Sequence, residues 1–206
     1  MTSTYSGGSS GHDTARKMKV TKAQAQANRT HIVETASTLF RERGFDGVGV
    51  ADLMAAAGFT HGGFYKHFGS KVDLMAESAA CGALQTEALL ADASIADIVN
   101  QYLSREHRDA RGTGCTMAAL GGDAARQPSA VRATFADTIE RLSAALSTGD
   151  AAMEGMDGAQ ARARSLVILA QMVGAIVMSR ACPDDSPLAD EILTSCRNAI
   201  SASLPG

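Results

Sequence analysis

A short segment after residue 59 combines cationic, phenolic and imidazole side chains at a spacing that suits contact with a polyanion. Tyr65, Lys66 and Lys71 can each donate a hydrogen bond to a phosphate oxygen. We expect a helix to begin here, with Thr60 capping it through its side-chain oxygen. His61 is the longest polar side chain in the first turn of that helix, which suits contact with a base edge.

Two glycines, Gly62 and Gly63, stand in the same first turn. Each costs a helix roughly 1 kcal/mol relative to alanine, so the pair indicates a place where a partner approaches the backbone closely. Phe64 and Phe68 are four residues apart and should share the inner face. The exposed face then consists of His61, Gly62, Gly63, Tyr65, Lys66 and His67.

The preceding residues predict two helices that position this segment. A helix from Lys22 carries one apolar stripe and ends at Gly44, and a short second helix ends at Gly58. Two short helices joined at Ala57–Phe59 form the pattern of a helix-turn-helix, whose second helix enters the DNA major groove. The expected core is aromatic and consists of Phe40, Phe45, Phe59, Phe64 and Phe68.

Residues 29–76 resemble the DNA-binding domain of TetR-family transcriptional regulators. The resemblance rests on many positions at fixed spacing: Ala36, Phe40, Gly44, Phe45, Val50, Ala57, Gly58, Phe59, Thr60, Gly62, Tyr65, His67, Phe68, Ser70 and Lys71. Val48 and Gly49 depart from the Thr and Ser/Thr usual in the family, and Gly63 replaces a frequent Thr. One or two of the family's polar DNA contacts are therefore in question.

The resemblance implies a homodimer that binds a palindromic double-stranded DNA operator and responds to a small-molecule effector, most commonly as a repressor. The DNA-binding residues it implies are Thr60, His61, Gly62, Gly63, Tyr65, Lys66, His67 and Lys71. The alternative is a helical bundle that binds a small molecule, or acts as an enzyme, without a DNA role.

Patterns beyond residue 76 are helical throughout, so the chain is expected to be all-α. Glycine and proline breaks separate the expected helices, which cover 94–110, 115–126, 129–147, 158–181 and 187–203. The expected organisation is a disordered arm (1–20), a three-helix DNA-binding domain (21–76), and a helical domain for ligand binding and dimerisation (77–206). Ser70 and Asp73 should form a capping box at the start of the helix that leads into this last domain.

The stretch Leu166–Met178 is apolar around most of the helix circumference and should need cover on two sides, from its own domain and from a partner. The alternative is the central helix of a monomeric bundle. Gln171 and Gly174 interrupt the stretch, which is too short to span a bilayer, so no membrane contact is expected.

Aliphatic and methionine side chains indicate an adaptable, mostly apolar effector site. After residue 72 the aromatic residues are Tyr102 and Phe135, which makes an aromatic cage for a cation improbable. The candidate ligand residues are Cys115, Met117, Phe135, Met172 and Ile176, while Arg105, Arg108, Arg132 and Arg141 are expected on the surface. Cys115 lies near a helix start and Arg111, so it is either a reactive thiol or a small buried apolar residue.

The net charge of −3 is unevenly distributed. Residues 1–72 hold nine Lys or Arg against five Asp or Glu, and residues 73–206 hold ten against seventeen, which favours a polyanion as partner of the first segment. Four dispersed cysteines and the lack of a signal pattern favour a reducing cytoplasm. No metal-ligand spacing, nucleophile elbow or phosphate loop is present, so no metal, cofactor or enzymatic activity is expected.

Overall fold

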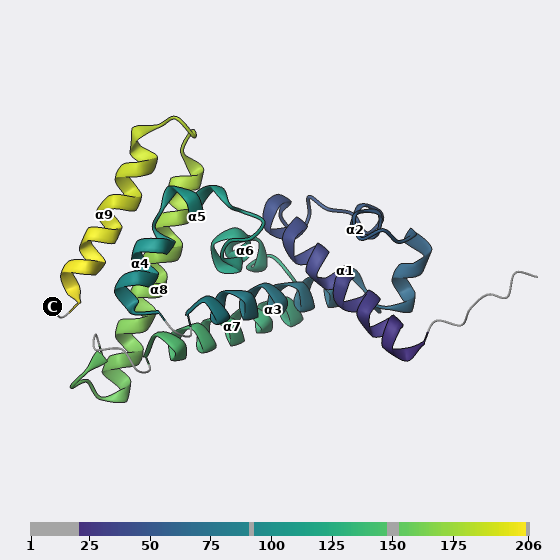
Figure 1. Cartoon of the computed structure of the whole chain (residues 1–206), viewed down its shortest axis with the longest axis horizontal. Helices are drawn as coiled ribbons and strands as arrows, with labels where there is room; N and C mark the ends of the chain where they lie inside the picture. Colours follow the sequence, from purple (N-terminus) through teal and green to yellow (C-terminus); the bar gives the residue numbers. More distant parts are fainter. Residues whose placement is uncertain (1–20, 91–92, 148–152, 205–206) are drawn as a thin grey trace, which may run out of the picture.

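The computed structural model describes residues 21–90, 93–147 and 153–204, and the expected arm at residues 1–20 lies outside them. These residues form helices and no strand, which confirms the predicted all-α fold (Figure 1). The elements are α1 (Lys22–Arg43), α2 (Val50–Ala56), the 3₁₀ helix η1 (His61–Lys66), α3 (Lys71–Leu90), α4 (Ile95–Tyr102), α5 (Arg105–Asp109), α6 (Thr116–Ala124), α7 (Ser129–Ser147), α8 (Gly158–Ala181) and α9 (Pro187–Ser203).

Helix α1 begins and ends where its sequence predicts. The Thr21 hydroxyl accepts a hydrogen bond from the Gln24 amide at 3.1 Å, which caps the first turn. At the other end Gly44 has φ 77°, a left-handed conformation that glycine adopts without strain, and its amide donates to the Phe40 carbonyl at 2.8 Å. The predicted stripe is buried around Ile32 and Phe40.

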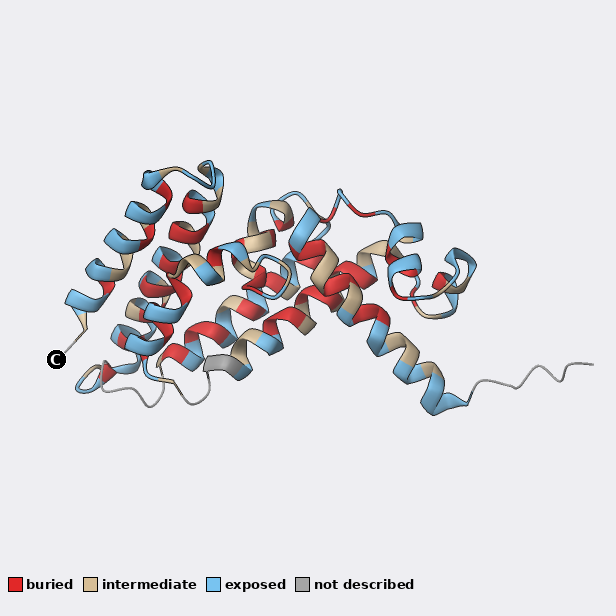
Figure 2. Ribbon diagram, turned by 45° about the horizontal axis from the view of Figure 1, so that its top comes forward, coloured by how far each residue is buried: buried red, intermediate tan, exposed pale blue. Residues whose placement is uncertain are grey.

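The two predicted domains, 21–76 and 77–206, share a helix and a core. Helix α3 runs without a break across the boundary expected between residues 76 and 77. The core of α1, α2 and η1 continues into α6 and α7 (Figure 2), where the Phe45 and Phe135 rings meet edge to face at 6.4 Å. Because tightly packed cores transmit strain, a displacement on one side of this shared core should displace residues on the other side.

A second core lies among α4, α7, α8 and α9. The single helix expected over 94–110 is instead two short helices, because the backbone leaves the helical region at Leu103 (φ −88°, ψ 49°). Ser104 then starts α5, its hydroxyl accepting from the His107 amide at 3.1 Å. The last three helices agree with their predicted ranges.

Helix α8 is long and apolar enough, by length and composition, to cross a membrane, so the expectation that this segment is too short is wrong. In the structure it packs against α7 and α9 and buries Ile168, Met172 and Ile176, as the core helix of a domain does. Its outer face still carries exposed apolar side chains, with Val167 57% and Met178 59% exposed. One face is thus covered within the chain, and the other is apolar and open.

Candidate DNA-binding surface and ligand cavity

The expected recognition helix is a six-residue 3₁₀ helix, not an α-helix. The Gly63 amide donates to the Thr60 carbonyl and the His67 amide to the Phe64 carbonyl, both at 2.9 Å and both three residues apart. Adjacent glycines in the first turn explain the weak α-helical preference. The Thr60 side chain makes no cap hydrogen bond, so its predicted capping role is wrong.

The two faces of η1 divide as the sequence predicts. Phe64 is fully buried and Phe68 nearly so, whereas Tyr65 is 72% exposed. His61 and Lys66 are also exposed, and no hydrogen bond or ion pair joins their side chains to another described residue. The outer face thus presents a phenol, an ammonium and an imidazole to whatever approaches it.

Packing within the chain does not require the glycines of η1. A Cβ atom on Gly62 would meet no heavy atom within 4 Å, and one on Gly63 would lie at an ordinary 3.6 Å from the Met54 methyl. Gly47 is the contrasting case, since a Cβ there would lie 2.1 Å from the Arg43 carbonyl oxygen. Packing would therefore allow a side chain at Gly62, and the glycine leaves the backbone of η1 open to a contact from outside the chain.

Arg29 of α1, which sequence reasoning missed, holds the end of η1 in place. Its Nε donates to the His67 carbonyl at 3.2 Å, and both terminal nitrogens donate to the Glu77 carboxylate at 2.5 Å. The guanidinium carbon also lies 4.7 Å from the centre of the Phe68 ring. These partners lie 38 to 48 residues away, a separation at which no sequence pattern reports contact.

Lys71, a predicted phosphate contact, is engaged within the protein. Its Nζ donates to the Phe45 carbonyl at 2.6 Å and lies 5.8 Å from the centre of the Phe40 ring. The ammonium therefore fixes the turn after α1 to the start of α3. Next to it, the Ser70 hydroxyl accepts from the Asp73 amide at 3.1 Å, the expected half of the predicted capping box.

Two family models match the chain. Residues 32–77 match the family described as bacterial regulatory proteins, tetR family. Residues 91–191 match the C-terminal domain described as transcriptional regulator LmrA/YxaF-like. The chain belongs to the TetR family. It is accordingly a DNA-binding transcriptional regulator, and its named relatives are regulators.

Sequence matches to relatives of this TetR-family protein cover either about a quarter of the chain or most of it. The regulator AcrR of Shigella flexneri is 40% identical over 57 residues, so the chain spans 26% of that protein and the match covers 28% of the chain. The regulator Rv0196 of Mycobacterium tuberculosis is 26% identical over 196 residues, covering 87% of the chain and 97% of that protein.

Solved structures agree in fold. Reduced NemR of E. coli has a TM-score of 0.71 at 18% identity, covering 87% of this chain and 97% of that one. A TetR-family regulator from Cytophaga hutchinsonii has a TM-score of 0.70 at 21% identity, covering 89% and 98%.

The C-terminal domain of this TetR-family chain holds a cavity of about 220 Å³. Helices α3, α4 and α5 and the loop before α6 supply its lining: Gln85, Thr86, Ile98, Gln101, Tyr102, Ser104, Glu106, His107, Ala110, Thr113, Gly114 and Cys115. Of the five predicted ligand residues only Cys115 lies there. Phe135 packs on Phe45, Met172 and Ile176 are buried in the second core, and Met117 packs against both cores.

His107 forms a fixed wall of the cavity. Its Nδ1 donates to the Tyr102 carbonyl at 2.8 Å, and its Nε2 accepts from the Cys115 amide at 3.2 Å. Burial lowers the pKa of His107, so the ring is neutral near pH 7 in this one tautomer. Its ring also lies 4.3 Å from that of Tyr102, which locks α4, α5 and the start of α6 together.

The Tyr102 hydroxyl is buried beside the Cys115 thiol, a weak acceptor whose geometry falls short of a full hydrogen bond. Burial raises the pKa of Tyr102 well above its ordinary value, and the neighbouring Cys115 thiol raises it further. The phenol therefore stays protonated and can donate. Cys115 itself is buried and stands at the N-cap of α6 without a side-chain cap bond.

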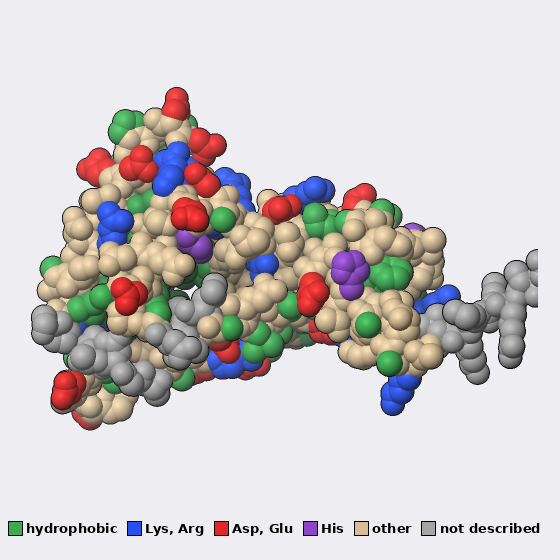
Figure 3. All heavy atoms as spheres, viewed as in Figure 1, with side chains coloured by type: hydrophobic (Ala, Val, Ile, Leu, Met, Phe, Trp, Pro, Cys, Tyr) green, Lys and Arg blue, Asp and Glu red, His purple; other side chains and the backbone are tan. Residues whose placement is uncertain are grey.

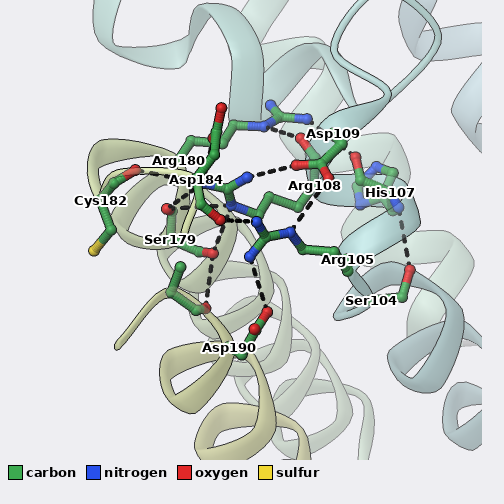
Figure 4. Close-up of polar contacts among 11 residues, drawn as sticks. Ser104, Arg105, His107, Arg108, Asp109, Ser179, Arg180, Cys182, Asp184 and Asp190 are labelled. Carbon is green, nitrogen blue, oxygen red and sulfur yellow. Dashed lines mark hydrogen bonds and ion pairs between the residues drawn. The ribbon is translucent and has the colours of Figure 1, made fainter. Parts of the chain in front are cut away.

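Arg108, expected on the surface, is 1% exposed and clamps α5 to the end of α8 (Figure 4). It donates to the Ser179 carbonyl and hydroxyl at 3.1 and 3.0 Å and pairs with Asp109 at 2.5 Å and Asp184 at 3.0 Å. Acidic side chains gather around this α8–α9 connection (Figure 3). The clamp fixes the helix that carries His107 into the cavity wall.

Proposed function

We propose that the protein is a homodimeric, ligand-responsive repressor that acts in the cytoplasm on a palindromic DNA operator. The observation that carries the DNA part is the outer face of η1, where bare backbone at Gly62 stands beside exposed Tyr65 and Lys66. A buried aromatic inner face holds these groups outward. The family supports the repressor and effector parts.

Each exposed residue has a role in this proposal. Tyr65 and Lys66 contact phosphates, which position the domain without reading sequence. His61, supported by Thr60 and His67, faces base edges, and Gly62 and Gly63 let the backbone approach the groove. Lys71 contributes through its remaining N–H donors, since one is bound to Phe45.

Selection of bound duplexes from a random library tests the DNA part. We expect enrichment of an inverted repeat whose half-sites lie about one helical turn, or a multiple of it, apart. Tyr65→Ala should weaken binding to the enriched duplex and to a scrambled duplex alike, because phosphates carry no sequence information. A library that enriches no inverted repeat would favour the alternative, a ligand-binding helical bundle without a DNA role.

The dimer is proposed to form through the outer face of α8 together with α9. Exposed apolar side chains gather there: Val167, Val177, Met178 and Leu188. Exposed apolar side chains on one helix pair are typical of a subunit interface. Two copies related by a twofold axis would cover it and present two recognition segments to the DNA.

Sedimentation velocity tests this interface. Val177→Glu should give monomers and abolish binding to the inverted repeat, because a buried unpaired carboxylate opposes association. Leu84→Glu is the matched control, since Leu84 is 55% exposed but lies on α3. Monomers from both variants, or dimers from both, would argue against α8 as the interface.

The effector is proposed to be a mostly apolar small molecule bound within residues 80–181 that lowers DNA affinity without separating the dimer. A reversible ligand should still release a Cys115→Ser variant from DNA. A thiol-reactive effector should not, and mass spectrometry should then find an adduct on Cys115 of the wild type. Absence of both an adduct and any thermal shift in a compound screen would remove the switch and leave the DNA-binding part standing.

A further inference from the structure

Arg41 of α1 lies between the DNA-binding domain and the cavity. It is 5% exposed, and its Nε donates to the Gly112 carbonyl at 2.8 Å. Its terminal nitrogens donate to the Ser37 hydroxyl at 3.0 Å and to the Gln85 side-chain oxygen at 3.3 Å. None of these acceptors is a carboxylate, and burial lowers the pKa of Arg41. The same guanidinium thus touches α1, a cavity-lining side chain and the loop that closes the cavity.

Two glycines bring α1 against the cavity walls with no side chain between them. A Cβ on Gly82 of α3 would lie 2.2 Å from an Arg41 nitrogen. A Cβ on Gly112, in the loop before α6, would lie 2.6 Å from the Glu42 carboxylate. The residues that follow Gly112 line the cavity. The loop therefore has one side on α1 and the other on the cavity, so a shift of one side displaces the other.

The groups around the cavity favour an oxygen acceptor as ligand. The buried Tyr102 hydroxyl has the Cys115 thiol beside it, a weak acceptor that leaves the donor open to a stronger one. The Gln85 side-chain oxygen is taken by Arg41, while its amide nitrogen makes only a 4.0 Å contact with a sulfur, which leaves an N–H donor for a ligand. Arg180 donates to the carbonyls of Arg108 and His107 and also lacks a carboxylate partner. These two guanidiniums beside the cavity oppose a cation, and they outnumber the one exposed carboxylate in its lining, that of Glu106.

We propose that the cavity binds a small organic molecule through an oxygen that accepts hydrogen bonds from Tyr102 and Gln85, and that Arg41 relays its presence to α1. The inference rests on the proposed ligand-responsive function and names the ligand chemistry and the relay within it. A ligand that accepts a hydrogen bond from the Gln85 amide reorients the Gln85 side chain. The hydrogen bond from Arg41 to the Gln85 oxygen then changes, and so does the hydrogen bond from Arg41 to the Gly112 carbonyl. Ligand and DNA then favour different positions of α1, which is the differential affinity a switch requires.

Four phenyl compounds of similar size test the ligand chemistry by thermal shift and ligand-observed NMR at millimolar concentration. Acetophenone and benzoate carry an oxygen acceptor, ethylbenzene carries none, and benzylamine carries a cation. We expect the two acceptors to raise the melting temperature more than ethylbenzene and benzylamine to raise it least.

Tyr102→Phe should remove the advantage of the acceptors over ethylbenzene, because the phenol hydrogen is lost while the ring remains. Tyr65→Phe, at an exposed tyrosine far from the cavity lining, is the matched control and should keep that advantage. Equal binding of ethylbenzene, a preference that survives in Tyr102→Phe, or no binding of either acceptor would each overturn the proposed ligand chemistry.

Hydrogen exchange of α1 and η1 peptides, with and without the better-binding acceptor, tests the relay in the absence of DNA. In the wild type we expect the acceptor to change exchange in α1. Arg41→Lys keeps the charge but cannot make all three contacts, so it should bind the acceptor and lose that change. Arg43→Lys, an exposed arginine in the same helical turn, should behave as the wild type.

Gln85→Met provides a second test that leaves the grip of Arg41 on Ser37 and Gly112 intact, at an exposed position where folding should be unaffected. At saturating acceptor it too should lose the change in α1. An unchanged response in both variants, or no response in the wild type, overturns the relay. Because no DNA is present, failure of operator binding is a separate result and would count against the proposed function alone.

Discussion

The recognition segment and the ligand cavity leave donors unpaired in opposite surroundings. Tyr65 and Lys66 are exposed, so water satisfies them, and in the proposed complex DNA would take its place. The Tyr102 hydroxyl is buried, and the group beside it is the weakly accepting Cys115 thiol. An unpaired donor in water costs the fold little, whereas a buried one costs about 1–3 kcal/mol. The exposed donors of the recognition segment therefore do not destabilise the free protein. The buried Tyr102 donor does, so a ligand that accepts its hydrogen bond should stabilise the fold.

A side chain at Gly62 should reduce DNA binding more than any other substitution considered for these two regions. Gly62→Val should lower operator affinity by about 100-fold or more, because the branched side chain prevents contacts worth about 1–3 kcal/mol each. The melting temperature should fall only slightly, since a Cβ there meets nothing within 4 Å. Gly63 is a less clean site, because its Cβ would already touch Met54. Fluorescence anisotropy and circular dichroism melting measure the two effects.

Gly122→Val is the matched control for this substitution. Gly122 is an exposed helical glycine in α6 with the same empty surroundings, but it lies outside η1. It should leave operator affinity unchanged. A parallel loss of affinity in both variants would mean that valine disturbs the fold and that Gly62 does not face DNA.

The two regions also differ in how far the sequence predicted them. The recognition segment is contiguous, so helix ends at Gly44 and Gly58 and the spacing of Phe64 and Phe68 were enough to place its faces. The cavity is assembled from residues 85 to 115, whereas apolar composition indicated Met172 and Ile176, which lie in the second core and outside the lining of this cavity.

Contacts over long sequence separations account for the remaining differences. Nothing in the sequence around Arg108 distinguishes it from a surface arginine. Its burial follows from contacts with Ser179 and Asp184, which are more than 70 residues away in the sequence. Lys71 likewise lies beside a phosphate-binding pattern, and only the fold shows that Phe45 binds it. Periodicity reports which face of a helix is apolar, but it carries no information on which element covers that face.

Arg29 supports the recognition segment from α1, and its loss should have a smaller effect on operator affinity than a side chain at Gly62. Arg29→Met should lower operator affinity about 10-fold, because the end of η1 loses the hydrogen bond at His67, and a misplaced segment loses roughly the equivalent of one base contact. The free energy of unfolding should fall by only about 1 kcal/mol or less, since the pair with Glu77 is partly exposed.

Arg162→Met removes a comparable forked ion pair, with Glu140, at a surface away from η1. It should leave operator affinity unchanged, which separates support of η1 from a general effect of losing a charge. If Arg29→Met binds the operator as tightly as the wild type, the η1 segment holds its position without Arg29.

Lys66 and Lys71 differ in whether the ammonium is bound within the chain: that of Lys66 is exposed, and that of Lys71 donates to the Phe45 carbonyl. Lys66→Ala should lower the slope of log affinity against log salt by about one unit per subunit and leave stability unchanged. Lys71→Ala should change that slope less, since one of its donors is bound to Phe45, and should lower the free energy of unfolding by about 1 kcal/mol, because the turn at Phe45 loses its charged donor. Salt titrations and urea unfolding of both variants measure the two effects. A larger change of slope in Lys71→Ala than in Lys66→Ala, with no loss of stability in Lys71→Ala, would show that Lys71 is the main phosphate contact.

The smallest expected effect lies in the cavity wall and depends on pH. Burial lowers the pKa of His107 below the ordinary histidine value of about 6.5, so the unfolded chain binds the proton more readily than the folded one. The stability that the neutral ring contributes is therefore present above the unfolded pKa and is lost as pH falls through the folded pKa. Protonation would also place a proton on Nε2, which accepts a hydrogen bond from the Cys115 amide.

His107→Gln cannot titrate, so its melting temperature should fall less than that of the wild type between pH 7 and mildly acid pH. His31→Gln, in the DNA-binding domain, should follow the wild type. Parallel pH profiles for wild type and His107→Gln would mean that the imidazole is already free to take up a proton in the folded cavity wall.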